Sequence, residues 1–320
     1  MSVTGTAQID PGVANYFDSR LLRKATPRLI HLRYAQTRDL PANESDVIKF
    51  RRYSLLSPAT TPLTEGVTPS GTSLAKTDIT ATVKQYGDYI TLTDKLLFTT
   101  TDPVLKEANA VLAQQAGNTL DQITRDVLLA GTTVQYASTA TQRSEVAAAM
   151  KITRAEIKEA VRTLKNNDAE KITEMINPGS GQETSPVDAA FIAFVTPGTT
   201  FDLKELTGFI PVEKYGQRVA LPGEIGALDE VRFIESTNSK VFTGAGDSGI
   251  DVHATLVFGA DFYAQTRISG QAMKNIIKPL GSAGSADPLD QRQTTGWKAT
   301  FVATRLNEAF GVRIEHAVSA

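Results

Sequence analysis

A long connection without a helical or strand period constrains the fold more than any other part of the chain. Residues 54–76 contain three prolines and two glycines among many threonines and serines. A connection this long without structure is uncommon in a compact domain and usually indicates disorder, a lid or a binding loop. The segment also carries four leucines, Leu55, Leu56, Leu63 and Leu74. Because these apolar residues favour an ordered state, we expect an extended hairpin whose tip is buried by another subunit.

The segments on either side of this connection alternate apolar and polar residues, as β-strands do. In residues 46–53, Ile48 and Phe50 alternate with basic residues. In residues 77–93, the apolar positions change phase after Gly87. This change predicts a bulge or bend at that glycine, where the strand would change direction.

A long helix is predicted over residues 102–131. Asp102 is a suitable N-cap, Pro103 fits the first helical position, and Gly131 provides a stop. Apolar residues recur between these ends at spacings of three and four, which places them on one face. They are Leu105, Ala108, Leu112, Ala116, Leu120, Ile123 and Val127. We expect this stripe to be buried in a core.

The remaining chain mixes helices and strands. A capping box at residues 153–156 predicts a second helix that ends at Asn166 and Asn167. Residues 178–186 are predicted to be a flexible break, and the short apolar run 189–195 a buried strand. Because the elements follow no regular βαβ order, the predicted class is α+β. Further strands are expected at residues 231–235, 252–258, 297–304 and 309–314.

The N-terminal part carries a basic arm. Residues 11–38 hold six basic residues against one acidic residue, with aromatic and leucine residues between them. Two interpretations stay open because charge alone cannot separate them: a solvated helix face, or an arm that lies on a neighbouring subunit or faces a packaged polyanion. The basic residues are Arg20, Arg23, Lys24, Arg28, Arg33 and Arg38.

The composition excludes several functional classes. The 320 residues suffice for one large or two modest domains. A net charge of -2 argues against a dedicated nucleic-acid binder. The lack of cysteine excludes disulfides, thiolate metal sites and cysteine nucleophiles. The N-terminus has no secretory pattern, which predicts synthesis in the cytoplasm, and no apolar run is long enough to cross a membrane.

The sequence predicts no catalytic residue, cofactor or metal site. Residues 244–249 match G-x-G-x-x-G, but a dinucleotide site needs a helix after the motif, and a strand pattern follows here. We therefore expect a plain turn. His31, His253 and His316 lie far apart in the sequence, and no pair of acids can be nominated for acid–base work.

The order of these elements resembles that of the major capsid proteins of tailed phages, which have the Hong Kong 97 type fold. Within that group the chain looks most like the phage N4 coat-protein family. The likeness is carried by Leu63-Thr64-Glu65-Gly66 in the connection, by Gln85-Tyr86-Gly87 with Thr93-Asp94 in the outgoing strand, and by residues 114–131 of the long helix.

The resemblance implies a division into four parts. Residues 1–45 would form an N-terminal arm and residues 46–95 an extended loop. Residues 96–186 and 285–320 would form a peripheral domain with its spine helix at 102–131, and residues 187–284 an axial domain of mixed α/β structure. Copies of the chain would form hexamers and pentamers and then an icosahedral shell around the double-stranded DNA of a phage.

The resemblance also implies the partners. The chain opens almost directly into its arm, so a separate scaffolding protein is expected, with portal and decoration proteins as further partners and non-specific contact with packaged DNA. The protein would belong to the virion, be assembled in the host cytoplasm, and catalyse nothing. Contacts between subunits are expected from the loop residues Leu55, Leu56, Leu63, Thr64, Glu65, Gly66 and Leu74, and from the arm residues Arg20, Arg23, Lys24 and Arg28.

Three alternatives remain at this point. An encapsulin-like compartment shares the fold and would carry enzyme cargo, although the Leu63 to Gly66 pattern does not favour it. A nucleotide-binding enzyme would use residues 244–249. A phage decoration or host-adhesion protein is disfavoured by the long helix, because such proteins tend toward all-β trimers.

Overall fold

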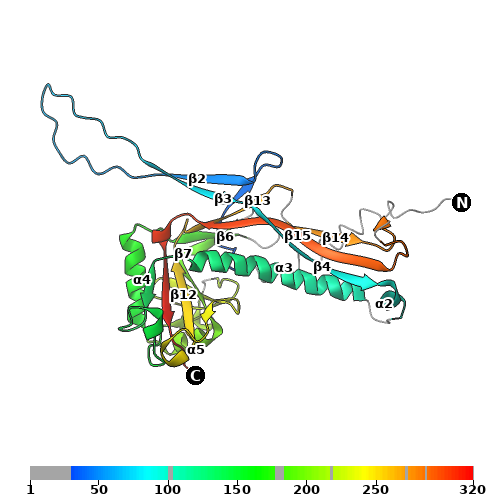
Figure 1. Cartoon of the computed structure of the whole chain (residues 1–320). Coiled ribbons are helices and arrows are strands. Elements are labelled where there is room, and N and C mark those ends of the chain that lie inside the picture. Colours follow the sequence, from blue (N-terminus) through cyan, green and yellow to red (C-terminus); the bar gives the residue numbers. More distant parts are fainter. Residues whose placement is uncertain are drawn as a thin grey trace.

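The structure is a computed structural model that describes residues 30–99, 104–176, 184–216, 219–270, 273–284 and 287–319. Figure 1 shows a rounded lobe, an elongated arm in which a long helix lies along a sheet, and a hairpin that projects away from both. Several predicted features lie outside the described residues, namely Arg20, Arg23, Lys24 and Arg28 of the arm, and Asp102 and Pro103 at the helix start.

The rounded lobe is built on one mixed sheet. Its nine described strands follow the order β5-β16-β12-β7-β10-β9-β8, with β11 beside β12 and β6 beside β7. The central strands are apolar and almost wholly buried, as expected for strands covered on both faces. The strands are β5 (Val134–Tyr136), β6 (Ile172–Ile176), β7 (Thr184–Val195), β8 (Ile210–Pro211), β9 (Glu224–Leu228), β10 (Val231–Glu235), β11 (Val241–Phe242), β12 (Val252–Phe258) and β16 (Gly311–His316).

Two helices complete the lobe. Helix α4 (Arg154–Asn166) buries Ile157 and Leu164 in the same core cluster as strands of the sheet. Its predicted capping box is confirmed, because the Glu156 carboxylate accepts a hydrogen bond of 2.7 Å from the Thr153 backbone N–H. Helix α5 (Pro197–Glu205) follows β7 directly. Short 3-10 segments are Arg143–Glu145, Val212–Lys214, Asp247–Gly249 and Glu308–Phe310.

The sheet of the elongated arm is organised around one long strand, β15. Its order is β1-β13-β15-β14, and β4 also pairs with β15. The first part of β15 lies between β14 and β4, and its last part pairs with β13. All these pairs are antiparallel, whereas β1 and β13 run parallel. The strands are β1 (Gln36–Leu40), β4 (Lys84–Thr93), β13 (Tyr263–Ile268), β14 (Met273–Lys278) and β15 (Arg292–Arg305).

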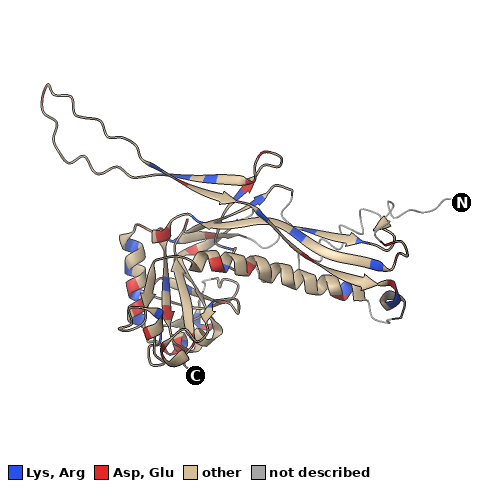
Figure 2. Ribbon diagram, viewed as in Figure 1, with Lys and Arg blue, Asp and Glu red and all other residues tan. Residues whose placement is uncertain are grey.

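The predicted long helix is α3 (Val104–Leu129), which follows the short helix α2 (Asp94–Thr99). Its apolar stripe is confirmed as core, since Leu112 and Leu120 are buried together with Trp297 and Phe301 of β15. Ala113 and Ala116 let the helix approach the sheet closely. Figure 2 shows few charged residues along the middle of this helix. No helix among the described residues is long and apolar enough to cross a membrane.

The predicted hairpin is confirmed. Strands β2 (Val47–Tyr53) and β3 (Lys76–Thr82) pair antiparallel over their whole length, and residues 54–75 project beyond their far end as an open loop. The loop runs away from the rest of the chain in Figure 1.

The expected bend at Gly87 is wrong. The register of β4 against β15 is continuous from residue 84 to residue 93, and the chain instead changes sheets at Val83. There the Val83 N–H donates to the Asp46 carbonyl at 2.8 Å, between the end of β3 and the start of β4. Close packing explains why glycine occupies position 87. A Cβ at Gly87 would lie 2.5 Å from the Trp297 carbonyl oxygen.

Three element boundaries also differ from expectation. The flexible break at residues 178–186 is wrong at its end, where residues 184–186 already belong to β7 and pair with β6. The strand expected at 297–304 begins at Arg292, and the one expected at 309–314 begins at Gly311 after a 3-10 turn. Strands β10 and β12 lie as predicted. The mixed α+β class is confirmed.

Strand pairing groups the chain differently from the ranges that the resemblance implied. β5 and α4, from the range 96–186, and β16, from 285–320, belong to the same lobe as β7, β10 and β12. β13 and β14, from the range 187–284, pair instead with β15 in the elongated arm. The reason is that strands far apart in the sequence share a sheet, so that neither sheet follows the implied ranges.

Candidate assembly surfaces

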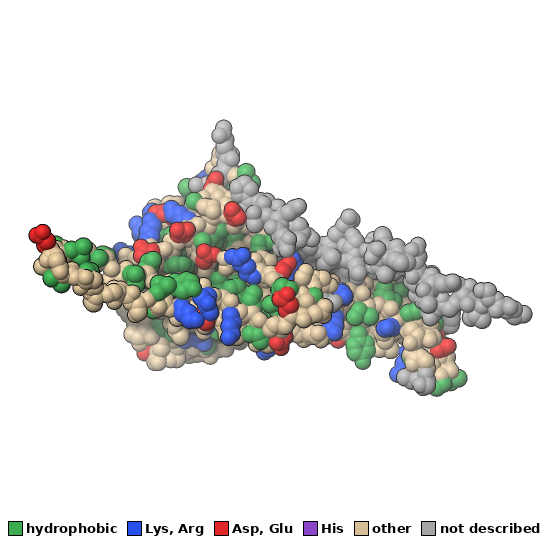
Figure 3. All heavy atoms as spheres, turned by 90° about the horizontal axis from the view of Figure 1, so that it is seen from above, with side chains coloured by type: hydrophobic (Ala, Val, Ile, Leu, Met, Phe, Trp, Pro, Cys, Tyr) green, Lys and Arg blue, Asp and Glu red, His purple; other side chains and the backbone are tan. Residues whose placement is uncertain are grey.

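The projecting loop presents apolar side chains to solvent. Leu55 is 96% exposed and Leu63 is 78% exposed, and Leu56, Val67 and Leu74 are also exposed. In the view of Figure 3, green side chains are visible along this projection. Loop residues 55–74 contain one charged residue, Glu65. An exposed apolar segment of this kind is typical of a surface that a partner covers.

The hairpin that carries the loop has a basic face. Arg51 donates to Asp78 at 2.8 Å across the two strands, and Lys76 lies 4.0 Å from the same carboxylate. This ion pair holds the pKa of Asp78 below its usual value, chiefly through the hydrogen bond from Arg51. Lys49 lies on the same face and adds a further positive charge.

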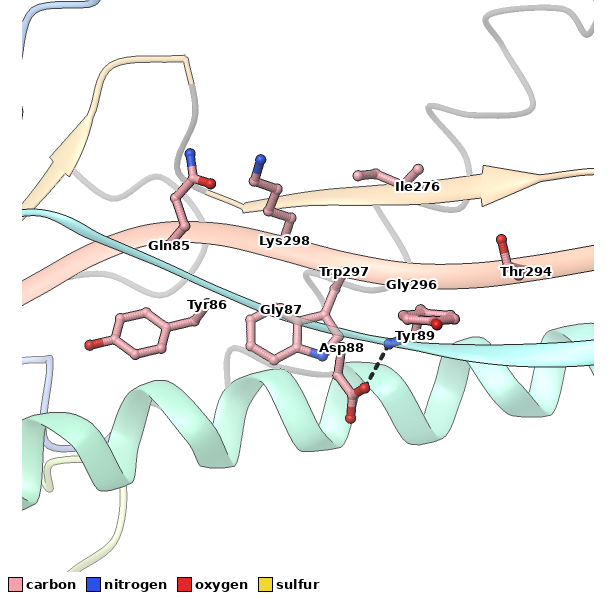
Figure 4. A pocket seen from close by; sticks show the side chains of 10 residues that line it. All are labelled: Gln85, Tyr86, Gly87, Asp88, Tyr89, Ile276, Thr294, Gly296, Trp297 and Lys298. Carbon is pink, nitrogen blue, oxygen red and sulfur yellow. Dashed lines mark hydrogen bonds between the residues drawn. The ribbon is translucent and has the colours of Figure 1, made fainter. Parts of the chain in front are cut away.

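A hollow of about 570 Å³ lies on the elongated arm, over strands β4, β14 and β15. Gly87 and Gly296 leave space there, because neither has a side chain on the outer face of the sheet. Figure 4 shows Lys298 and Ile276 on one side of these strands and Trp297 on the side of helix α3. Tyr89 is directly opposite Gly296 and is 67% exposed.

The floor of this hollow is fixed to the spine helix by one glutamine. The Gln115 side chain donates to Asp88 at 2.5 Å and accepts from the Trp297 ring N–H at 3.2 Å. The bond from Gln115, with a second from the Tyr89 backbone N–H, lowers the pKa of Asp88. These two bonds of Gln115 hold strands β4 and β15 in a defined position on α3.

A buried polar cluster joins the spine helix to the lobe. Asp121 of α3 accepts from the His31 backbone N–H at 2.9 Å and from the Asn238 side chain at 2.8 Å. Arg125, one turn further along, donates to the Asn238 carbonyl at 2.8 Å. Burial alone raises the pKa of Asp121, but the contacts with His31 and Asn238 outweigh burial and hold that pKa below its usual value. The helix and the lobe are thus joined by hydrogen bonds to Asn238 as well as by packing.

Two histidines that are distant in the sequence meet in the lobe. His253 of β12 is directly opposite His316 of β16, and their rings stack with centroids 6.4 Å apart. The His253 ring contacts the Thr196 hydroxyl at 2.7 Å, and the His316 ring contacts the Thr255 hydroxyl at 2.9 Å. Burial lowers the pKa of His253, and it lowers that of His316 to about 4. The described residues nevertheless contain no group of three side chains able to hold a metal ion.

The glycine motif at residues 244–249 forms a turn, as predicted. It lies between β11 and β12, and its last residues make a single 3-10 turn instead of starting a helix.

The structure brings the predicted loop residues Leu55 to Leu74 onto one projection, but it places no described residue of the same chain over them. Sequence reasoning missed the hollow and the histidine pair. Both depend on strand register, which joins β4 to β15 and β12 to β16. The one available signal for the hollow was glycine within strand patterns, which indicates close approach of another backbone or a ligand.

A spine helix along a sheet, a rounded mixed lobe and a projecting hairpin together define a capsid protein fold of the Hong Kong 97 type. The chain belongs to the phage capsid protein family, which matches residues 76–314. It is a phage major capsid protein and a component of the virion. Among curated proteins, no sequence matches the chain.

Solved capsids share the fold at low sequence identity. The capsid of Ralstonia phage GP4 is 11% identical, with 90% of this chain and 88% of that chain covered and a TM-score of 0.70. The capsid of cyanophage Pam1 is 15% identical, with 93% and 92% covered and a TM-score of 0.65. The capsid of cyanophage P-SCSP1u is 12% identical, with 89% and 87% covered and a TM-score of 0.64.

Proposed function

We propose that copies of this chain assemble through hexamers and pentamers into an icosahedral shell around phage double-stranded DNA, and that the chain has no catalytic role. The observation that carries this proposal is the loop at residues 54–75. It exposes five large apolar side chains on a projection that packs against no described part of its own chain. Burial of such apolar surface by another subunit is favourable by about 25 cal/mol per Å². Assembly would therefore bury the apolar side chains that the monomer leaves in water.

Finer assignments belong to the same proposal. The loop lies on a neighbouring subunit through Leu55, Leu56, Leu63 and Leu74. The basic arm residues Arg20, Arg23, Lys24 and Arg28 contact a neighbour or the packaged DNA, in keeping with their charge. The nine-stranded lobe acts as the axial domain, and the sheet with α3 acts as the peripheral domain.

The partners and the subfamily are proposed on sequence grounds. A separate scaffolding protein, a portal and decoration proteins complete the particle, which assembles in the host cytoplasm. The Leu63 to Gly66 pattern and its companions favour the phage N4 coat-protein group within the capsid family.

The test is deletion of residues 58–73. The deleted segment lies outside the hairpin strands and the core, so the variant should keep its circular dichroism spectrum and unfolding temperature. Negative-stain electron microscopy and size-exclusion chromatography, with the chain expressed alone and with its neighbouring genes, should show closed shells or rings for the wild type only. Normal shells from the deletion variant would contradict the loop's role. A wild type that stays monomeric under every condition would contradict the proposed function itself.

A further inference from the structure

One basic side chain is buried without a partner among the described residues. Arg33 precedes β1 and is only 8% exposed. Its Nε and Nη1 atoms have no hydrogen-bond partner, and no described carboxylate forms an ion pair with it. A guanidinium stays protonated in proteins, and a buried charge is unfavourable unless it is paired. Arg33 is therefore a buried positive charge that requires an anion.

The backbone around Arg33 is fixed on both sides. The Arg33 carbonyl accepts a hydrogen bond of 2.7 Å from the Ile176 N–H of β6. Two residues earlier, the His31 N–H donates to Asp121 of α3 at 2.9 Å. The segment therefore joins the lobe to the spine helix. Its backbone cannot move to bring the guanidinium into water without breaking these buried hydrogen bonds, which is costly.

Asp121 acts on Arg33 from within the fold but does not pair with it. Burial lowers the pKa of Arg33, and the charge of Asp121 offsets only part of this effect. The Asp121 carboxylate instead accepts hydrogen bonds from the His31 N–H at 2.9 Å and from the Asn238 side chain at 2.8 Å. The described fold thus leaves the charge of Arg33 largely uncompensated.

A hollow of about 440 Å³ lies beside Arg33, where the lobe meets the arm sheet. It is lined by Arg33 and Tyr34, by residues of β1 and by β6. The Tyr34 hydroxyl is also buried without a hydrogen-bond partner among the described residues. Burial raises the pKa of Tyr34, and the charge of Arg33 acts against this rise, so the two polar groups lie close together. Two residues with unpaired hydrogen-bond donors therefore line the same hollow.

The other charges of this hollow favour a small ligand. Asp39, Glu174 and Asp261 also line it. Asp39 is paired with Arg267 at 3.0 Å, whereas Glu174 and Asp261 are exposed. A strand of nucleic acid carries a phosphate on every nucleotide, so its neighbouring phosphates would meet these carboxylates. A single small oxyanion would place its charge on Arg33 alone.

We infer that the guanidinium of Arg33 binds one small oxyanion, a phosphate or a carboxylate, in this hollow. Arginine suits either group because its planar guanidinium offers two parallel N–H donors. The anion supplies the counter-charge of Arg33 and so stabilises the junction of β1, β6 and α3. Its source is inorganic phosphate in solution or an acidic side chain of another chain. The inference does not depend on the proposed shell, because the residues that line the hollow belong to one chain.

The experiment uses inorganic phosphate and the full chain as unassembled subunits. Thermal unfolding is followed in sodium phosphate and in sodium chloride at equal ionic strength and neutral pH. Phosphate should raise the unfolding temperature of the wild type by about 2 °C or more, because a ligand that binds the folded state stabilises it. Arg33→Met should abolish this rise. Arg38→Gln is the matched control and should keep it, since Arg38 is an exposed arginine of the neighbouring β1.

The same two buffers should also reverse the order of stability. In chloride, Arg33→Met removes a buried charge that has no counter-charge, so the variant should be at least as stable as the wild type. In phosphate, the wild type should be the more stable of the two. Isothermal titration calorimetry of the wild type needs no variant and should detect one phosphate bound per chain.

Phosphate titration of assembled shells separates the two sources of the anion. Shells that respond like the unassembled subunits take the anion from solution, and shells that no longer respond hold a carboxylate of another chain at Arg33. Both results support the site. The inference is overturned if phosphate and chloride act alike on wild-type subunits, if calorimetry detects no binding, or if Arg38→Gln also abolishes the rise. It is equally overturned if Arg33→Met is less stable than the wild type in chloride, which would assign Arg33 a partner within its own chain.

Discussion

The loop and the nine-stranded lobe place apolar and charged side chains in opposite ways. In the loop, leucines lie in water, and Leu55 is almost fully exposed. In the lobe, charged groups lie in the interior: Arg232 and Glu224 are both buried, as is Glu315. Each region departs from the usual rule that apolar residues are inside and charges outside.

The difference lies in whether each group has a partner. The Arg232 guanidinium donates to both carboxylate oxygens of Glu224, which also accepts from the Tyr215 hydroxyl at 2.7 Å. Arg143 donates both its hydrogen bonds of 2.7 Å to Glu315. The loop leucines have no comparable contact with the part of the chain that the structure describes. The buried charges of the lobe are therefore paired within one chain, whereas the loop leucines are left exposed.

A charge without a partner in the interior should give the largest effect. Leu112→Asp places a carboxylate in the core between α3 and β15, where it would cost more than about 4 kcal/mol and prevent folding. Soluble expression and circular dichroism measure this. The matched control is Val111→Asp, one residue away but 58% exposed, which should change stability by less than about 0.5 kcal/mol. Soluble, assembly-competent Leu112→Asp protein would show that the stripe is not core.

Removal of one member of a buried ion pair should come next. Arg232→Met leaves Glu224 buried without its cation, at a cost of about 3–5 kcal/mol. Chemical denaturation should show the loss as a lower midpoint. The double variant Arg232→Met with Glu224→Gln removes both charges and should recover part of the loss. A single variant as stable as wild type would show that Arg232 does not stabilise the buried charge of Glu224.

Acid should weaken the lobe while leaving the loop unaffected. The pKa of His316 is lowered by burial to about 4, below the value of about 6.5 in an unfolded chain. Between these values the unfolded chain binds more protons, so the free energy of unfolding falls as the pH is lowered from 6.5 to 4, by up to roughly 3 kcal/mol. Thermal unfolding across this range measures the fall. The slope should be smaller in His316→Gln, and an unchanged slope would assign the effect to other groups.

Substitution of the loop leucines should have the smallest effect on stability. Leu55→Ser with Leu63→Ser removes apolar groups that are already in water, so the free energy of unfolding should change by less than about 0.5 kcal/mol. Shell yield should nevertheless fall. Leu120→Ala in the buried stripe is the contrasting change and should cost about 2–5 kcal/mol. A large loss of stability from the loop variant would mean that the loop packs within its own subunit.

Local patterns predicted the elements that local forces determine. The apolar stripe of α3, the capping box of Thr153 and Glu156, and the loop between β2 and β3 are all readable within a short window. The bend predicted at Gly87 was wrong because glycine is required there by the Trp297 carbonyl, which is more than two hundred residues away in the sequence. The pairing of β16 with β12, and with it the pairing of His316 with His253, also depends on contacts that no local pattern encodes. The exposure of the loop leucines follows from a local pattern, but the hollow over β4, β14 and β15 does not, since it exists only in the register of these strands.

The attachment of the hairpin at Val83 has a mechanical consequence. Strand β2 has seven residues, and with half of the connection it forms a cantilever of about 18 residues, up to roughly 60 Å long. It is clamped at one end, where the Val83 N–H bonds to the Asp46 carbonyl. A rotation of about 5° at the clamp moves the free end by roughly 5 Å for a lever of this length. Small torsions of one peptide segment are thus amplified at the tip. In the proposed shell, this would let the loop follow neighbouring subunits at different dihedral angles while the lobe and the arm sheet of its own subunit stay unchanged.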